Sequence, residues 1–286
     1  MIRKFKDTDI NEIMDIWLDL NIKAHNFIDK NYWISKYDDV KKAIANAEVY
    51  VYDDGEIKGF VGLVDSYIAG IFAKQNSKGI GSKLLNEVFN KYDHVSLSVF
   101  EKNDRAVKFY LNKGFVIDKC RIDNDTGAMT LDMVYKRNGL MLKEYKSSDC
   151  SEIIRLFYNS VHNVCAKDYS KELLDLWATG LEDEKIWDES LSKNYTVVAV
   201  KDDVIVGFAD LTKDGYINRL YTHYKYQRQK IATNILKLLE LNNTNSKYTY
   251  ASITARGFFL KNGYIEEKEN VVLKEGVKLK NYLMRK

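Results

Sequence analysis

A short glycine-containing segment, NSKGIGSKLL at residues 76–85, has the composition of an anion-binding loop. Gly79 and Gly81 tolerate left-handed backbone conformations and leave room for a ligand to approach the backbone. The apolar residues that follow predict a helix, whose N-terminal N–H groups and dipole favour negative charge. Ser77, Lys78 and Ser82 can add further donors. The segment therefore predicts a phosphate-binding loop, and the alternative is a plain helix start with glycines for close packing.

The segment QRQKIATNIL at residues 227–236 repeats this pattern with altered residues. Lys230 stands in place of the first glycine and Ala232 in place of the second. A residue other than glycine costs about 1–2 kcal/mol in a left-handed conformation, and its side chain points to where a phosphate would approach. Lys230 also carries a positive charge. We therefore expect this segment to bind phosphate more weakly than the first, but not to exclude it.

These two segments belong to a longer internal repeat. MIRKFKDTDINEI at 1–13 returns as MLKEYKSSDCSEI at 141–153, and FYLNKGF at 109–115 returns as FFLKNGY at 258–264. A period of this length is too long for a solenoid unit. The sequence therefore predicts two copies of one domain, residues 1–138 and 139–286. The linker near KRNG is very short, so we expect the two domains to pack together.

The hydrophobic periodicity gives the same order of elements in both copies. In the first copy it predicts the helices Thr8–Leu20, Gly79–Asn90 and Asp104–Asn112, and the strands Glu48–Asp53, Gly59–Val64, Tyr67–Ala73 and His94–Val99. In the second copy it predicts the strands 196–201, 204–211 and 215–221, a strand near Tyr248, and helices that begin at Gln229 and Ala255. This order predicts an α+β fold, in which each copy forms a mixed, mostly antiparallel twisted sheet flanked by helices.

The composition excludes several classes of protein. The chain has 44 basic and 41 acidic residues, a net charge of +3, and this balance argues against a nucleic-acid or membrane-binding surface. No apolar run is long enough for a transmembrane helix, and the N-terminus has no signal-peptide core. The three cysteines, Cys120, Cys150 and Cys165, are irregularly spaced. They predict reduced thiols in a cytoplasmic protein and no metal site.

A second motif, EKNDRAVKFYLNKGF at residues 101–115, follows a predicted strand. Asn103 opens the helix, and Tyr110 comes near its end. A strand, a glycine loop into a helix, a further strand and then N-x-x-A-x-x-F-Y-x-x-x-G-F is a specific order. In this order the sequence resembles the GNAT superfamily of acetyl-CoA-dependent N-acetyltransferases, and the resemblance covers both copies.

The resemblance implies that acetyl-CoA is the cofactor, that two segments of the first copy hold it, and that the matching segments of the second copy are a possible second site. The strand matching Tyr67–Ala73 pairs with the pantetheine arm, and the loop matching 76–82 holds the pyrophosphate. The implied cofactor-binding residues of the first copy are Ile71, Phe72, Ala73, Asn76, Ser77, Lys78, Gly79, Ile80, Gly81, Ser82, Asn103, Ala106, Phe109 and Tyr110. The matching second set is Leu220, Tyr221, Gln227, Arg228, Gln229, Lys230, Ile231, Ala232 and Thr233. Asn76 departs from the Gln or Arg usual in the family, and the loop is shorter than the family norm.

The resemblance also places Tyr110 near the thioester sulfur. A neutral phenol, with a pKa of about 10, can protonate a departing thiolate whose acid has a pKa of about 8.5. Phe259 occupies the matching position of the second copy and cannot donate a proton. A backbone N–H on the strand that ends at Ile71–Ala73 is the expected donor to the oxyanion.

The residue that removes the proton of the amine is left open by the sequence. His25 and Asp65 are the two candidates, because His25 titrates near neutral pH and Asp65 precedes the cofactor strand. The alternative for His25 is a structural position at a helix end. Tyr32 and Trp33 either line the acceptor pocket or belong to the core. In the second copy the same choice applies to the set His162, Asp168, Tyr169 and Trp177.

The sequence thus predicts an N-acetyltransferase whose first copy moves an acetyl group from acetyl-CoA to a primary amine by direct attack. The acceptor is a small molecule or a peptide. The second copy is expected to be divergent and catalytically weak or inactive. Two alternatives remain: both copies act on different acceptors, or the chain is a non-catalytic sensor of acyl-CoA or another ligand.

Overall fold

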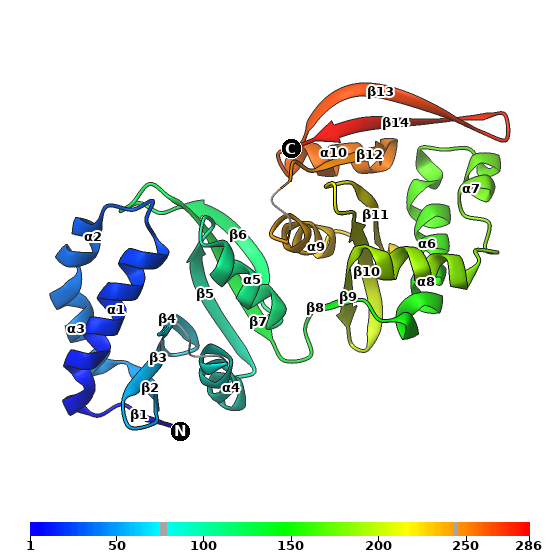
Figure 1. Ribbon diagram of the computed structural model, residues 1–286. Coiled ribbons are helices and arrows are strands. Elements are labelled where there is room, and N and C mark those ends of the chain that lie inside the picture. The colour runs from blue at the N-terminus through cyan, green and yellow to red at the C-terminus, as the bar shows by residue number, and fades with distance from the viewer. Residues whose placement is uncertain (75–78, 243–244) are drawn as a thin grey trace. The chain divides into compact units, whose positions relative to one another are not determined.

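The computed structural model describes residues 1–74, 79–242 and 245–286 (Figure 1). It divides the chain into two compact units. Unit 1 comprises Met1–Tyr110 and Phe115–Arg137, and unit 2 comprises Leu111–Gly114 and Asn138–Lys286.

Unit 1 follows the order of elements expected for the first copy. Its strands are β1 (Ile2–Lys4), β2 (Glu48–Asp53), β3 (Ile57–Val64), β4 (Tyr67–Ala73), β5 (His94–Phe100), β6 (Val116–Ile122) and β7 (Met129–Lys136). Its helices are α1 (Ile10–Ala24), α2 (Lys30–Ser35), α3 (Tyr37–Asn46), α4 (Ile80–Lys91) and α5 (Asp104–Asn112), with a 3-10 turn, η1 (Asp7–Asp9). The strands form one seven-stranded sheet in the order β1-β2-β3-β4-β5-β7-β6. β4 and β5 are parallel and the other neighbours are antiparallel, so the sheet is mixed and mostly antiparallel.

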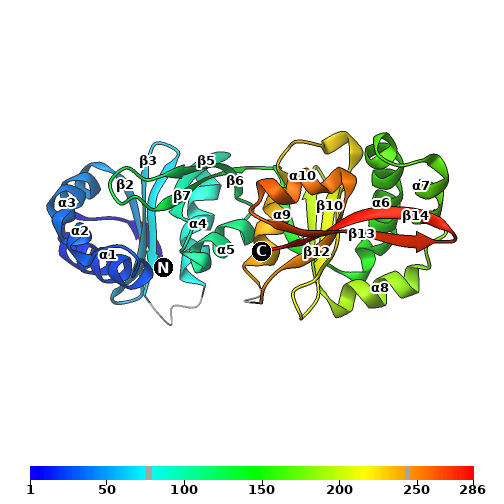
Figure 2. The same cartoon turned by 90° about the horizontal axis from the view of Figure 1, so that it is seen from above.

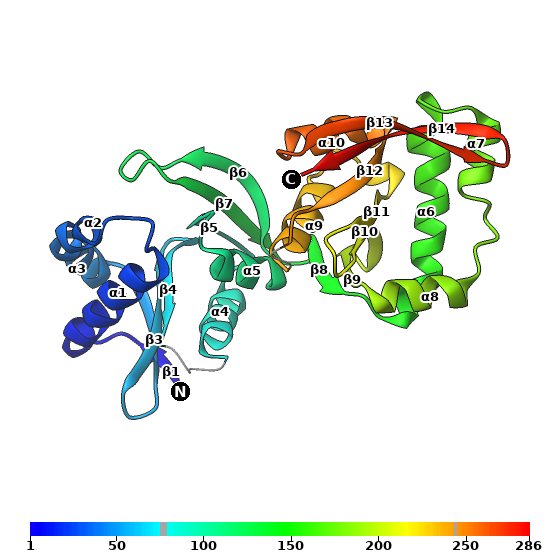
Figure 3. The same cartoon turned by 45° about the horizontal axis from the view of Figure 1, so that its top comes forward.

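β4 and β5 pair over a short length only. Their register joins Tyr67 to Ser96 and Ile68 to Leu97, and the later residues of the two strands are not in register with each other. In Figure 3 the strands β5 to β7 extend away from β3 and β4. The sheet of unit 1 therefore opens beyond Ile68 and Leu97, and the candidate site lies along this opening.

Unit 2 repeats the order of unit 1. Its strands are β8 (Met141–Glu144), β9 (Tyr195–Lys201), β10 (Val204–Leu211), β11 (Ile217–Thr222), β12 (Tyr248–Ser252), β13 (Ile265–Lys274) and β14 (Val277–Arg285). Its helices are α6 (Cys150–Val164), α7 (Lys171–Trp177), α8 (Glu184–Lys193), α9 (Ile231–Glu240) and α10 (Ile253–Lys261), with the 3-10 turns η2 (Ser147–Asp149), η3 (Cys165–Lys167) and η4 (Tyr224–Tyr226). The strands form two sheets, β11-β10-β9-β8 and β12-β14-β13. A single-residue parallel bridge between Tyr216 and Tyr248 joins the two sheets. The strands β11 and β12 of unit 2 therefore part almost along their whole length, whereas β4 and β5 of unit 1 still belong to one sheet.

Helices cover both faces of the strands in each unit, as Figure 2 shows. α1 to α3 lie on one face of unit 1, and α4 and α5 on the other. α1 buries Ile13, Met14 and Trp17 at helical spacing against residues of β2 and β3. α6 buries Ile153 and Phe157 in the same way in the core of unit 2. The apolar periodicity of the sequence therefore marks the faces that turn toward the sheets.

The ends of several helices differ from the sequence prediction, and local geometry explains why. α1 continues to Ala24, past the expected end at Leu20. α9 begins at Ile231 and not at Gln229, because the left-handed conformation of Lys230 is incompatible with a right-handed helix at that residue. α10 begins before Ala255, since the Ser252 Oγ accepts a hydrogen bond from the Ala255 N–H at 3.1 Å and caps the helix.

Among the residues that the structure describes, no helix is both long and apolar enough to cross a membrane. The three cysteines are not joined in disulfides; Cys120 is exposed, whereas Cys150 and Cys165 are buried.

Candidate active site

The opening beside β4 exposes an unpaired backbone edge. The Lys74 N–H donates to the Lys58 carbonyl at 2.8 Å, which makes Lys74 a hydrogen-bonded partner of β3. Such pairs alternate along antiparallel strands. The N–H and C=O groups of Ile71 and Ala73 therefore point away from β3, on the side where β5 has no residue in register with them. This edge can hydrogen-bond an extended, amide-containing ligand.

A β-bulge lies where the opening begins. Gly62 pairs with Gly70 and Leu63 with Ile68, so Ala69 is an extra residue on β4. A bulged residue is left out of the regular ladder. Its N–H is a candidate oxyanion donor beside those of the strand end that the sequence indicated.

Tyr110 lies near the point where the two strands part. Its ring packs edge-on against Phe109 and Phe115, at centroid distances of 5.3 and 5.4 Å, and the residue is 7% exposed. Burial raises the pKa of Tyr110, and the nearby phenol of Tyr67 raises it further. Tyr67 is one of the β4 residues that pair with β5. A phenol that stays neutral at this point can act as a proton donor.

The start of α4 has room for an anion. Gly79 is left-handed, with φ +80°, and a Cβ built on it would meet no described atom within 4 Å. A Cβ on Gly81 would lie 3.5 Å from Phe109 Cζ, so the first turn of α4 packs close to α5. The helix start thus fits a phosphate group. The predicted ligands Asn76, Ser77 and Lys78 lie outside the described residues.

The corresponding loop of unit 2 keeps the backbone conformation without the glycine. Lys230 is left-handed, with φ 59° and ψ 13°. The Gln227 Nε2 donates to the Thr222 carbonyl at 3.1 Å, to its Oγ1 at 2.8 Å and to the His223 carbonyl at 3.1 Å. Gln227 therefore holds its own loop, and its amide is not turned outward toward a phosphate. The Gln229 Oε1 accepts from Lys201 Nζ at 3.0 Å.

β11 also retains the open edge of its counterpart. The His223 N–H donates to the Val206 carbonyl at 2.9 Å, so alternation turns the backbone groups of Thr222 and Leu220 away from β10. The Thr222 carbonyl is the one that Gln227 contacts. Unit 2 therefore keeps the backbone features of a cofactor edge, but fills one position of it with its own side chain.

Phe259 occupies the same aromatic setting as Tyr110. Its ring packs edge-on against Phe258 and Tyr264, at centroid distances of 5.3 and 5.1 Å, and the residue is 2% exposed. The distances nearly equal those around Tyr110. The two positions thus differ in the hydroxyl and hardly in the packing.

Asn103 and His25 contact each other across a long sequence separation. The Asn103 Oδ1 accepts from the Ala106 N–H at 3.2 Å, which leaves the amide nitrogen to donate to His25 Nε2 at 3.1 Å. The neutral His25 ring must then carry its proton on Nδ1. Burial lowers the pKa of His25, and the Asn21 carbonyl partly offsets this. The lone pair that a general base would use is already engaged, so the geometry favours the structural alternative for His25.

The burial of His25 predicts a pH-dependent contribution to stability. The pKa of His25 is lowered by folding from an ordinary value of 6.5, so the unfolded chain binds more protons near and just below that pH. The stabilisation is then present above pH 6.5 and is lost as the pH falls. We expect the difference in unfolding free energy between wild type and His25→Phe to shrink from pH 7.5 to pH 5. A difference that stays constant over this range would contradict the assignment.

Two carboxylates differ in their position relative to the opening: Asp65 lies at the paired end of β4, next to Ser66, and Asp132 contacts the first β5 residue beyond the paired segment. Asp65 occupies the turn between β3 and β4, is exposed, and has φ 53°. Asp132 of β7 is not among the residues predicted from the sequence; its Oδ1 accepts from Ser98 Oγ at 2.6 Å and from Arg121 Nε at 3.1 Å. Ser98 is the first β5 residue beyond the paired segment. The alternation of polar and apolar residues in HVSLSVF, the sequence of β5, could have indicated that Ser98 faces away from the core, but it gives no sign of its partner Asp132.

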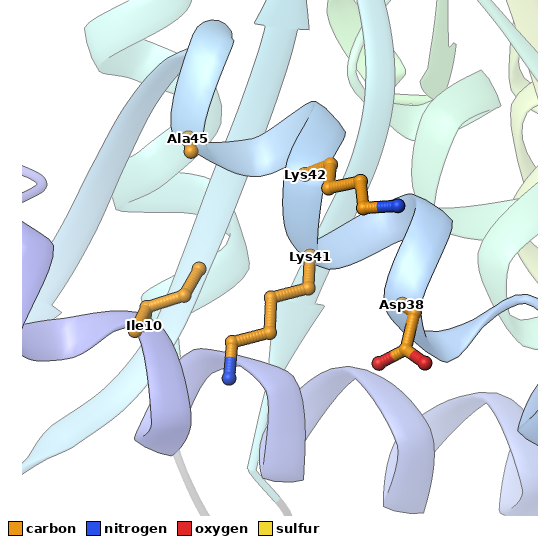
Figure 4. Close-up of a pocket in the computed structure, with 5 residues that line it drawn as sticks. All are labelled: Ile10, Asp38, Lys41, Lys42 and Ala45. Atoms are coloured by element: carbon orange, nitrogen blue, oxygen red, sulfur yellow. The ribbon is translucent and has the colours of Figure 1, made fainter.

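A hollow between α1 and α3 lies apart from these residues (Figure 4). Its volume is about 420 Å³, and its lining residues are Ile10, Asp38, Lys41, Lys42 and Ala45. Lys41 reaches across to α1, where its Nζ donates to Asn11 Oδ1 at 3.1 Å. None of the predicted site residues lines this hollow, so we do not assign it to the active site.

Comparison with known proteins identifies the family. Residues 10–115 match the acetyltransferase (GNAT) family and residues 165–286 match the acetyltransferase (GNAT) domain. The chain is 34% identical over 131 residues to the peptidyl-lysine N-acetyltransferase YiaC of Escherichia coli K12, over 44% of this chain and 90% of YiaC. The chain belongs to the GNAT family of acetyltransferases. It is therefore an acyltransferase with two GNAT domains in tandem, and the predicted family and fold are confirmed.

Two further GNAT proteins match about half of this chain. The uncharacterized N-acetyltransferase YafP of E. coli K12 is 29% identical over 148 residues, which cover 52% of this chain and 96% of YafP. The crystal structure of a GCN5-related N-acetyltransferase from Rhodopseudomonas palustris is 31% identical, with a TM-score of 0.49, and covers 52% of this chain and 95% of its own.

The residues predicted to line an acceptor pocket in the first GNAT domain lie among aromatic rings. Trp33 is 8% exposed, stacks on His25 at 5.2 Å and meets Trp17 edge-on at 6.0 Å. It is therefore a core residue. Tyr32 is more exposed, and partial burial raises its pKa.

In the second GNAT domain the corresponding residues are engaged in internal contacts. The His162 Nε2 lies 2.9 Å from the Ala178 carbonyl. Tyr169 and Trp177 meet edge-on at 5.4 Å, and Asp168 Oδ2 accepts from Thr254 Oγ1 at 2.5 Å. These contacts favour the alternative of helix and core residues over an acceptor pocket.

The two GNAT domains also differ in the cross-strand residue pair that lies next to the β-bulge. Gly62 and Gly70 face each other in unit 1, whereas the equivalent pair in unit 2 is Asp210 and Arg219. Asp210 is fully buried and accepts from Arg219 Nε at 2.8 Å and from the amides of Asn194 and Asn218 at 2.6 and 3.0 Å. This charged cluster is not evident from the sequence, because the pairing of β10 with β11 brings Asp210 and Arg219 together.

Proposed function

We propose that this GNAT chain transfers an acetyl group from acetyl-CoA to a primary amine in its first domain, residues 1–138. The observation that carries the proposal is the position of Tyr110. It is a buried, neutral phenol close to Tyr67, beside the point where β4 and β5 part, in a unit that also has an open backbone edge on β4 and a left-handed Gly79 at the start of α4.

The residues of unit 1 fit the parts of acetyl-CoA. When bound, acetyl-CoA supplies a thioester that a neutral amine can attack directly. The backbone groups of Ile71 and Ala73 would hold the pantetheine amides, and the start of α4 at Gly79 would hold the pyrophosphate. The N–H at the Ala69 bulge would stabilise negative charge on the acyl oxygen. Tyr110 Oη would supply a proton to the leaving thiolate.

The proton of the amine is removed by a carboxylate and not by His25. The Nε2 lone pair of His25 accepts from Asn103, whose other amide atom is fixed by the helix cap. Asp65 remains the predicted acceptor, and Asp132, which accepts a hydrogen bond from Ser98 beside the opening, is a second candidate. The His25→Phe variant, used in the experiments that follow, tests this statement through its kcat.

The second domain, residues 139–286, is proposed to be a divergent partner without its own acid catalyst. Phe259 provides no proton, and Gln227 occupies part of the β11 edge. A second candidate has support from one observation: Lys230 keeps the left-handed conformation of a phosphate loop. This favours weak binding of acetyl-CoA by unit 2 over complete loss.

The acceptor class is tested by incubating the full chain with acetyl-CoA and a panel of amines. A lysine-containing peptide comes first, because the related YiaC is a peptidyl-lysine N-acetyltransferase; a polyamine, a peptide with a free N-terminus and an aminoglycoside follow. Release of free thiol together with a product heavier by one acetyl group supports the proposal. Binding of acetyl-CoA with no turnover on any amine would favour the non-catalytic sensor.

A further inference from the structure

In unit 1, α1 is attached at its two ends to different parts of the opened sheet. At its first turn, Glu12 Oε1 accepts from the Ile57 N–H at 3.0 Å, at the start of β3. Just past its last turn, His25 Nε2 accepts from Asn103 Nδ2 at 3.1 Å, between β5 and α5. The helix therefore links the β1–β4 part of the sheet to the β5–β7 part.

In unit 2, α6 is attached in the same way through different residues. Glu152 Oε1 accepts from the Ile205 N–H at 3.0 Å, at the start of β10. Beyond the other end, Tyr169 Oη accepts from the Ile253 N–H at 2.7 Å and donates to the Lys280 carbonyl at 2.8 Å. The Asp168–Thr254 hydrogen bond lies beside it. The link is thus present in both domains although the side chains that make it differ.

The helices α1 and α6 connect the two parts of each unit in the region where the strands are not paired with each other. In unit 1 the register between β4 and β5 ends at Ile68 and Leu97, and in unit 2 one bridge joins the two sheets. Beyond these points no ladder fixes the separation of the two strands among the described residues. A helix bonded to both sides can fix it.

We propose that α1 and its counterpart α6 are struts that set the separation of the opened strands, and that the His25–Asn103 hydrogen bond is the joint of the strut in unit 1. His25 and Asn103 are then positioning residues. Asn103 acts on the N-terminus of α5, the helix that carries Tyr110, and does not contact the cofactor itself. The effect on acetyl-CoA rests on the proposed function; the effect on α5 does not.

The joint can be removed by two independent variants. His25→Phe keeps an aromatic ring against Trp33 but has no acceptor at Nε2. Asn103→Ser keeps a helix cap, as Ser252 does for α10, but cannot reach His25. Each variant is expected to weaken acetyl-CoA binding by about fivefold in calorimetry, as the loss of one hydrogen bond would. The double variant should be no weaker than either single one, and kcat should stay within about twofold.

The proposal has a ligand-free readout and two matched controls. Both variants should speed amide hydrogen exchange in α5 without bound ligand. His25→Gln, whose Oε1 can accept from Asn103, should restore the affinity, and Thr254→Val in unit 2 should leave it unchanged. Additive losses in the double variant, or unchanged affinity and exchange in both single variants, would overturn the strut. If wild type binds no acetyl-CoA, the proposed function fails, and the exchange measurement still decides the strut.

Discussion

The Tyr110→Phe variant is expected to lose about 100- to 1000-fold in kcat, while its dissociation constant for acetyl-CoA stays within about twofold of wild type. In the proposed mechanism the hydroxyl donates the proton, whereas the ring supplies the packing. Phe259 shows that a phenylalanine fits this aromatic setting, at 5.3 and 5.1 Å from its neighbouring rings. The measurement is steady-state kinetics at saturating acetyl-CoA and amine, together with calorimetry.

Phe259→Tyr is the matched control for this result. It adds a hydroxyl at the equivalent position of unit 2 and should leave the activity of unit 1 unchanged. Circular dichroism and the melting temperature show whether either variant perturbs the fold. A Tyr110→Phe enzyme with wild-type kcat would remove Tyr110 from the proton transfer, and one that no longer binds acetyl-CoA would make its role structural.

Asp210→Ala is expected to lower the unfolding free energy of unit 2 by about 3–5 kcal/mol. Asp210 is fully buried and accepts hydrogen bonds from Arg219, Asn194 and Asn218. Its removal leaves the Arg219 guanidinium, 12% exposed, without its counter-charge. Urea unfolding followed by tryptophan fluorescence reports the change, because Trp177 and Trp187 lie in unit 2.

A double-mutant cycle separates the charge from the packing. Arg219→Leu together with Asp210→Ala should cost less than the sum of the two single variants, because neither charge is then left alone. Unit 1, with Gly62 and Gly70 at the equivalent positions, shows that the fold does not require this ion pair. A loss below about 1 kcal/mol in Asp210→Ala would indicate that water or a neighbouring side chain replaces the carboxylate.

The fold could be predicted largely from the sequence because its signals are local. The apolar spacing of α1 and α6 and the repeat of FYLNKGF as FFLKNGY depend on neighbours in the chain. The left-handed conformation at Lys230 could also be anticipated, since the aligned position in the first copy is Gly79.

The site was harder to predict because its side chains meet across long sequence separations. Asn103 is predicted from the motif to contact the cofactor, and the structure adds internal contacts of both polar atoms of its amide that the motif does not give. Gln227 matched the family pattern, but its amide turns back to the end of β11. A motif gives the type of residue at a position, whereas the partner of its side chain depends on strand register and helix placement.

The most direct test of the account is calorimetric titration of acetyl-CoA into two matched variants, Gly79→Asp and Lys230→Asp. Aspartate tolerates the left-handed conformation of both positions, and it places the same negative charge at each phosphate loop. The account predicts that Gly79→Asp abolishes the tight acetyl-CoA site and that Lys230→Asp retains it. Loss of the tight site in Lys230→Asp, with normal binding in Gly79→Asp, would contradict the assignment of acetyl transfer to the first domain.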